Sequence, residues 1–331
     1  MQYYLNYVLG LRPDDENGWV VPKSQKKADK GSIVHKALEL LASKKLAMQE
    51  GQDTFSNDEV GRSWNTWSFD TDEAIEAAWN YYTKEKATPF EWTHFDYKDV
   101  RKWTIAATEL SGGMFNPLNR TIIWPEKYFD FVIEEPWARY NYTMTDGRRL
   151  EGHLGLKGTI DLTVKMDCCD DTIELIDWKT GMRKDWVTGK SKDWKKLRND
   201  PQLRLYHYAL SRLYPQARYI IISIVWIQDG GPFSLDFGPK DLAETEKMLR
   251  ERFDIIRECR RPKRIRFDSV HGWKCEKLCV FGINEWKQTG ETVCDHIHKQ
   301  LVTLGMDRVT REFGRQDAFA TYGDGGGRSG R

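Results

Sequence analysis

The stretch that decides the fold spans residues 158–181 and has the sequence GTIDLTVKMDCCDDTIELIDWKTG. Two segments rich in aliphatic and β-branched residues, 156–166 and 172–179, lie on either side of a polar Asp-Cys-Cys-Asp-Asp turn. Apolar runs separated by a short polar turn predict a β-hairpin. We expect Cys168 and Cys169, within the turn, to point to opposite sides and to be incidental to function.

Three charged side chains lie on these two strands. The hairpin would bring Asp161 beside Asp177, and the spacing of two residues points Asp177 and Lys179 to one face of an extended strand. Both carboxylates, with the backbone carbonyl of Trp178, can offer oxygen ligands to Mg²⁺ or Mn²⁺. The ammonium of Lys179 would position or help to deprotonate an attacking water. The alternative is a structural salt bridge, which would place three charges on apolar strands without a function.

Composition limits the class of protein. The chain has 331 residues, of which 40% are apolar, enough for a sizeable core in one large domain or two modest ones. A formal net charge of +1 is far below that of a small basic nucleic-acid module, so overall charge gives no support to nucleic-acid binding. Basic residues cluster at 190–198 and 257–266 and acidic residues at 50–76, although each run also fits a solvated face.

No targeting segment is evident in the sequence. The chain begins MQYYLNY, without the basic start and apolar run of a secretory signal. The longest apolar run, 219–227, is far too short to span a bilayer. We therefore expect a soluble, cytoplasmic protein that does not bind membranes. In that compartment the six cysteines are more readily thiols or metal ligands than disulfides.

Apolar periodicity predicts the other elements. Ser32 can cap a helix over 32–48 that has His35 at the edge of its apolar stripe. Asp200 and Pro201 are favoured at a helix start and predict a helix that ends before Pro215. Further helices are expected over 2–12, 70–87, 97–112, 242–259 and 291–304, further strands over 129–138, 140–144, 218–227 and 233–237, and irregular structure over 50–68.

Five short motifs follow one another along the chain. They are GSIVH at 31–35, EEP at 134–136, GTID at 158–161, IDWKTG at 176–181 and QLRLY at 202–206. Each is weak alone, but the ordered set resembles the PD-(D/E)XK nuclease superfamily, specifically its RecB-like branch, with the AddB-type and CRISPR-associated four-cysteine exonucleases. Ile160 stands where the superfamily name has proline.

The resemblance implies an α/β fold with a restriction-endonuclease-like core, in which helices flank a central mixed β-sheet. The predicted regions are an N-terminal helical region over 1–127, a nuclease core over 128–259, a cysteine-containing region over 260–304 and a tail over 305–331, disordered from about 322.

It also implies roles for residues outside the hairpin. His35 would add a ligand or hydrogen bond to the metal. Glu135, with Glu134 as the competing choice, would hold the metal through water or orient the nucleophile. Gln202 and Tyr206, four apart on one helix face, would hold substrate phosphate or the catalytic lysine; an ordinary helix face is the alternative.

A basic loop follows the lysine strand directly. It spans 183–198 and contains Trp186 and Trp194. We expect it to grip a DNA strand through phosphate contacts and base stacking.

The cysteines late in the chain leave three alternatives open. Many RecB-like exonucleases bind a [4Fe–4S] cluster with one early cysteine and three late ones, and Cys275, Cys279 and Cys294 could be the late three. The early cysteine would lie at or before Met1 and is absent, so Cys259 could substitute. Zinc is the rival, since Cys275, Cys279 and Cys294 with His296 or His298 supply four ligands; no metal is the third alternative.

The sequence thus predicts a metal-dependent DNA exonuclease of DNA recombination, repair or phage DNA processing. Hydrolysis would take one step, by an activated water and without a covalent intermediate. A structure-specific endonuclease and a non-catalytic DNA-binding subunit on a nuclease fold are the alternatives. DNA is the expected partner, together with a helicase or recombination protein.

Overall fold

The computed structural model describes residues 23–86, 88, 91–143, 149–184, 189–258, 279 and 293–313. Its contacts divide the chain into two compact units. The larger unit comprises 27–139 and 153–253, and the other comprises 1–26, 140–152 and 254–331. None of the described helices is both long and apolar enough to cross a membrane. The four-region division expected from the sequence stays a prediction.

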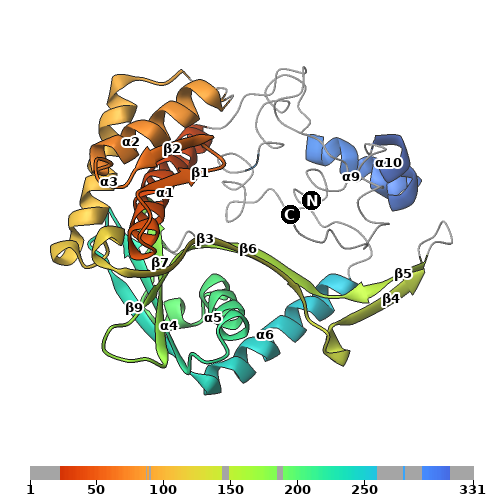
Figure 1. Cartoon of the computed structure of the whole chain (residues 1–331). Coiled ribbons are helices and arrows are strands. Elements are labelled where there is room, and N and C mark those ends of the chain that lie inside the picture. Colours follow the sequence, from red (N-terminus) through yellow and green to blue (C-terminus); the bar gives the residue numbers. More distant parts are fainter. Residues whose placement is uncertain are drawn as a thin grey trace. The chain divides into compact units, whose positions relative to one another are not determined.

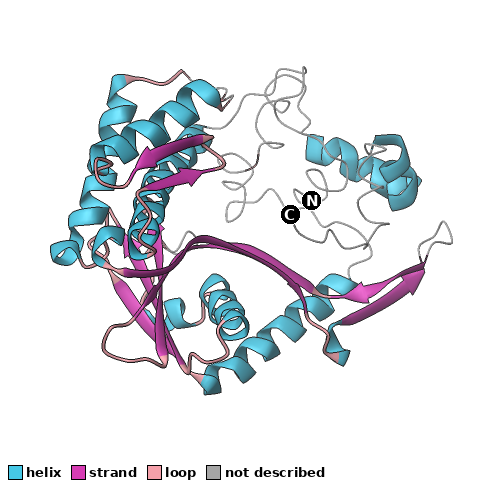
Figure 2. Ribbon diagram, viewed as in Figure 1, coloured by secondary structure: helices cyan, strands magenta, loops and turns pink. Residues whose placement is uncertain are grey.

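A five-stranded mixed sheet is the centre of the larger unit (Figures 1 and 2). Its strand order is β3-β6-β7-β8-β9, in which β7 and β8 are parallel and every other neighbouring pair is antiparallel. The strands are β3 (Thr121–Val132), β6 (Gly155–Lys165), β7 (Thr172–Lys179), β8 (Tyr219–Trp226) and β9 (Phe233–Phe237). The predicted central mixed sheet flanked by helices is confirmed.

The hairpin β6–β7 forms as predicted, with Leu162 opposite Ile176. Continued by one residue, this register sets Asp161 opposite Asp177. The expectation for the turn was wrong: the Sγ atoms of Cys168 and Cys169 lie 3.1 Å apart. The two cysteines lie in a turn, where neighbouring side chains need not alternate as they do on an extended strand.

Helices cover both faces of the sheet, so both faces of β7 are buried. One face packs against α1 (Lys23–Gln49), α2 (Thr71–Asn80), which continues as a π-helical turn Tyr81–Glu85, and α3 (His94–Gly113). The other face packs against α4 (Trp194–Arg198) and α5 (Pro201–Leu213), with α6 (Pro239–Glu258) beyond them (Figure 1). The remaining described elements are β1 (Thr54–Asn57), β2 (Arg62–Asn65), β4 (Arg139–Thr143), β5 (Arg149–His153), α9 (Val293–Leu304), α10 (Met306–Phe313) and short 3₁₀ turns at Pro117–Asn119 and Pro136–Ala138.

Two stretches near the first helix differ from expectation. α1 begins at Lys23 rather than Ser32, and the Ser32 hydroxyl donates to the Ala28 carbonyl within the helix instead of capping it. The added turns are polar and have no apolar stripe to reveal them. Residues 50–68 are not irregular, because β1 and β2 form a hairpin in which Phe55 stacks on Trp64.

The first strand of the sheet also differs, since β3 begins at Thr121 and not near residue 128. Pro125 interrupts the strand pattern of the sequence. A proline lacks the N–H that a central strand needs, but β3 is an edge strand and tolerates it.

Candidate active site

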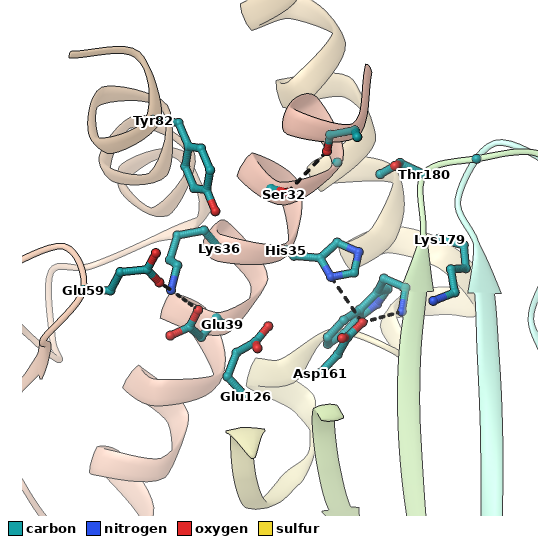
Figure 3. A pocket seen from close by; sticks show the side chains of 14 residues that line it. Ser32, His35, Lys36, Glu39, Glu59, Tyr82, Glu126, Asp161, Lys179 and Thr180 are labelled. Carbon is teal, nitrogen blue, oxygen red and sulfur yellow. Dashed lines mark hydrogen bonds and ion pairs between the residues drawn. The ribbon is translucent and has the colours of Figure 1, made fainter. Parts of the chain in front are cut away.

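A pocket of about 410 Å³ opens where α1 faces β3, β6 and β7 (Figure 3). Its charged or titratable lining comes from α1, the β1–β2 turn, the π-helical turn and the three strands: His35, Lys36, Glu39, Glu59, Tyr82, Glu126, Asp161 and Lys179. All of these residues belong to the larger unit. The pocket is therefore built within one compact body.

Asp161 on β6 is held by two partners. Its Oδ2 lies 3.2 Å from Nδ1 of His35, and the backbone N–H of Trp178 donates to the same oxygen at 3.1 Å. Burial pushes the pKa of Asp161 upward, but His35, Lys179 and the Trp178 N–H together lower it below its ordinary value. Burial lowers the pKa of His35, yet nearby Asp161 raises it above its usual value. The pair thus favours charged Asp161.

Asp177 and Lys179 form the second charged pair. Lys179 Nζ donates to Oδ1 of Asp177 at 2.9 Å and lies 2.8 Å from Oδ2. Burial raises the pKa of Asp177 to about 6, with Lys179 opposing and Asp161 adding to that shift. For Lys179 burial lowers the pKa, but the two aspartates outweigh it and raise the pKa, so the side chain is an ammonium.

Glu126 is the site residue that sequence reasoning missed. It lies on β3 between Pro125 and Lys127, which pair with Leu162 and Ile160, so it stands opposite Asp161. Its φ is +43°, a left-handed conformation that a non-glycine residue adopts at a cost. Such strain gathers at functional sites. Burial, together with Asp161 and Glu39, raises the pKa of Glu126 to about 8.

Glu135, the carboxylate expected in this role, is not brought to the pocket. It is exposed and precedes a 3₁₀ turn beyond the end of β3. β3 ends where Val132 pairs with Gly155, six residues from Asp161 on β6. That separation is about 20 Å of strand. Glu134 is exposed in the same segment. No short-range pattern marks Glu126, because Pro125 interrupts the strand pattern around it.

α5 places its polar side chains against the same carboxylates. Asp200 accepts a hydrogen bond from the Gln202 N–H and Pro201 begins the helix, as the sequence predicts. Gln202 Nε2 donates to the Tyr206 hydroxyl at 2.8 Å. Burial, with the charges of Asp177 and Asp161, raises the pKa of Tyr206 beyond its ordinary range. Tyr206 is thus a neutral donor at the site.

A second ion-pair cluster forms the opposite wall of the pocket (Figure 3). Lys36 is only 6% exposed and pairs with Glu39 on its own helix and, at 2.5 Å, with Glu59 from the β1–β2 turn. Burial lowers the pKa of Lys36, but the two glutamates raise it above its usual value. The ammonium offsets part of the negative charge near Glu126.

The donor set fits a hard divalent cation. Ligand atoms of His35, Glu126 and Asp161 all lie within 4.8 Å of one another. Oδ2 of Asp177 is buried and contacts Lys179 Nζ at 2.8 Å as an ion pair, without a well-aligned hydrogen bond among the described residues. Carboxylates suit Mg²⁺ and Mn²⁺, and the imidazole adds some preference for Mn²⁺. Trp178, expected to add its carbonyl, lines the same pocket.

Only two of the four predicted cysteine ligands lie among the described residues. Cys259 and Cys275 lie outside the described residues. Cys279 and Cys294 are half-buried, and Cys294 is in α9. A cysteine-bound cluster or zinc ion therefore stays a prediction.

Comparison with known proteins agrees with the fold and the pocket. The family model described as the PD-(D/E)XK nuclease superfamily matches residues 1–282. No curated protein matches the chain. The matched range contains every residue of the pocket and both strands of the central hairpin.

Proposed function

Because the chain belongs to the PD-(D/E)XK nuclease superfamily, a family of nucleases, we propose that it is a metal-dependent DNA exonuclease. The observation on which the proposal rests is the convergence of His35, Glu126, Asp161 and the Asp177–Lys179 pair. Charges so close together in a buried place are costly, and such clusters are retained where chemistry needs them.

The proposed mechanism assigns one task to each group. His35, Glu126, Asp161 and Asp177 would hold Mg²⁺ or Mn²⁺, which when bound supplies an activated water and polarises the phosphate. The Lys179 ammonium, oriented by Asp177, would stabilise the negative charge that develops on the phosphate oxygens. Tyr206 would keep Asp177 in place and Gln202 would fix the tyrosine hydroxyl.

Two other functions share this pocket. A structure-specific endonuclease would use the same chemistry at an internal phosphodiester. A non-catalytic DNA-binding subunit would not need Asp161, Asp177 and Lys179 to remain together at the cost of burying them. The second alternative is therefore the less favoured.

Digestion of defined DNA forms tests the proposal. We expect acid-soluble nucleotides to be released from linear end-labelled DNA with Mg²⁺ or Mn²⁺, and closed circular DNA to be spared. Lys179→Ala should abolish release while DNA binding persists. Lys165→Ala, at the far end of β6 in an exposed ion pair with Asp170, is the matched control and should retain activity.

Each result separates the alternatives. Cleavage of the circle would favour the endonuclease. Binding without cleavage by the unaltered protein would favour the DNA-binding subunit. If no DNA form is degraded with either metal, the enzymatic function is refuted.

The remaining parts of the proposal depend on sequence alone. They are a cytoplasmic location, a helicase or recombination protein as partner, and a [4Fe–4S] cluster on Cys259, Cys275, Cys279 and Cys294. A brown, anaerobically purified protein that absorbs visible light would support the cluster. A colourless protein with bound zinc would replace it with the zinc alternative.

A further inference from the structure

Trp194 is a large apolar side chain left in solvent. It is the first residue of α4 and is 54% exposed. Its ring packs against another aromatic side chain, because its centroid lies 5.5 Å from that of the Phe233 ring on β9. One edge of the indole is therefore supported while much of its surface remains accessible.

The support beneath Trp194 is itself fixed. The Arg183 guanidinium lies 4.0 Å from the centroid of the Phe233 ring, a cation–π contact. Trp226, at the end of β8, meets the same ring edge-on at 5.6 Å and is almost fully buried. Arg183 is fixed in turn, because its backbone N–H donates to Asp229 at 2.8 Å. Trp194 thus rests on a platform of packed side chains from β8, β9 and the segment that follows β7.

The platform lies at the same end of the sheet as the candidate active site. Trp226 is the register partner of Lys179 in the parallel pair β7–β8, so both side chains leave the same face. Ring steps of 5.6 Å and 5.5 Å then lead from Trp226 through Phe233 to Trp194. A row of packed aromatic side chains thus connects the register partner of Lys179 to Trp194.

The ion pairs around Trp194 reduce the number of cations that the basic loop, residues 183–198, can offer to DNA phosphates. Lys192 pairs with Asp200 at 2.8 Å and Arg198 pairs with Asp241 at 3.2 Å, so these cations are used within the protein. Lys195 is exposed and has no ion pair within the part of the chain that the structure describes. The loop therefore offers fewer cations to phosphates than its composition suggests. Beside those cations it offers the aromatic surface of Trp194.

We propose that Trp194 stacks on a nucleobase of single-stranded DNA bound at the active site. An aromatic ring can stack on a base only where the face of that base is uncovered, which holds for single strands and frayed ends. The inference rests on the proposed function and deepens it, since it names an unpaired strand as the substrate. Lys195 would contact a phosphate of that strand, independently of the base.

The test compares two oligonucleotides of equal length, oligo-dT and an abasic strand with the same phosphates. Binding is measured by fluorescence anisotropy of the labelled strands in EDTA, so that no cleavage occurs. Trp194→Ala should weaken oligo-dT binding about 5- to 150-fold, the range for loss of one stacked base, and leave abasic binding unchanged. Trp194→Phe should restore most of the affinity.

Two further variants isolate stacking from other effects. Lys195→Ala should weaken binding of both strands equally and reduce its salt dependence. Trp67→Ala is the matched control: Trp67 is 79% exposed, but its indole N–H is bound to Asp53 on the β1–β2 side of the unit. Trp67→Ala should change neither the affinity for oligo-dT nor the affinity for the abasic strand. Thermal unfolding of each variant confirms that it is folded.

The outcomes separate this inference from the proposed function. If Trp194→Ala weakens binding of oligo-dT and of the abasic strand equally, or weakens neither, stacking is refuted while the nuclease proposal stays intact. Failure of the unaltered protein to bind or degrade any DNA refutes both. Tighter binding of duplex than of single strands would also contradict the inference.

Discussion

Nδ1 of His35 lies 3.2 Å from Oδ2 of Asp161 and thereby joins α1 to β6 in the lining of the pocket. The two residues are far apart in the chain and end the motifs at 31–35 and 158–161. Glu126 adds a third ligand atom within 4.8 Å of both. The contact therefore brings a nitrogen donor to an oxygen site, which has consequences for the choice of metal.

His35→Ala should reduce affinity for Mn²⁺ more than affinity for Mg²⁺. The imidazole contributes to binding of the softer ion, whereas Mg²⁺ depends on the carboxylates and retained waters. We expect at least a tenfold loss for Mn²⁺ by isothermal titration calorimetry, about 1.4 kcal/mol. His94→Ala, an exposed residue of α3, is the control. Equal losses for the two ions would argue against a direct ligand.

Substitution of Glu126 and of Glu135, one at a time, tests which of them supplies the third carboxylate of the site, beside Asp161 and Asp177. Glu126→Gln should lower kcat/KM for DNA cleavage about 100-fold, because Glu126 faces Asp161. Glu135→Gln makes the same chemical change on an exposed residue outside the pocket and should leave cleavage unaltered. The reverse ranking of the two variants would restore the assignment expected from sequence.

The features predicted correctly are those determined by the pattern of residues that are close in the sequence. The β6–β7 hairpin needs only two apolar runs and a polar turn, and its register alone sets Asp161 opposite Asp177. The start of α5 likewise depends on Asp200 and Pro201, whose preferences at a helix N-terminus are local.

The features that were missed depend on tertiary contacts. Glu126 has an unusual φ inside a strand containing proline, and only the pairing of β3 with β6 makes that segment a strand. The first turns of α1 lack an apolar stripe, but Lys30 is bound by Asp99, 69 residues later, at 2.7 Å. Short-range patterns contain no information on such partners.

Close packing between α1 and the residue that follows β7 allows a test of how precisely Lys179 must be positioned. A Cβ added at Gly31 would lie 2.7 Å from Oγ1 of Thr180, the residue after Lys179. Gly31→Ala should therefore displace this end of β7 and lower cleavage about 10- to 100-fold, since a shift of about 1 Å can cost this much.

A double variant distinguishes displacement from simple loss of stability. Thr180→Ala removes the atom that the new Cβ would meet. Gly31→Ala combined with Thr180→Ala should then recover most of the activity of Thr180→Ala alone. Strict additivity of the two effects would mean that the close approach has no bearing on Lys179.

His207, a buried residue of α5, should make the folded protein less stable in acid. Its ring is 1% exposed and stacks on Phe237 at 5.1 Å, and Nδ1 has no hydrogen-bond partner among the described residues. Burial lowers its pKa to about 4; Arg204 on α5 and Arg198 on α4 add to that shift, while Asp241 on α6 opposes it.

Because the folded pKa lies below the unfolded value of about 6.5, the unfolded chain binds the proton first between these two values. The free energy of unfolding should therefore fall as pH decreases through this window, with about 2–4 kcal/mol due to His207. His207→Phe keeps a ring on Phe237 that cannot be protonated, and should flatten this part of the pH dependence.

Urea unfolding at intervals from pH 4.5 to 7.5 measures the effect as the difference between the two proteins at each pH. Any constant packing cost of the phenyl ring cancels in the slope of that difference, as do the titrations of Asp177 and Glu126, which both proteins share. His94→Phe, on the surface of α3, should leave the slope as in the unaltered protein. A parallel pH dependence in His207→Phe would mean that the buried imidazole is not a source of acid lability.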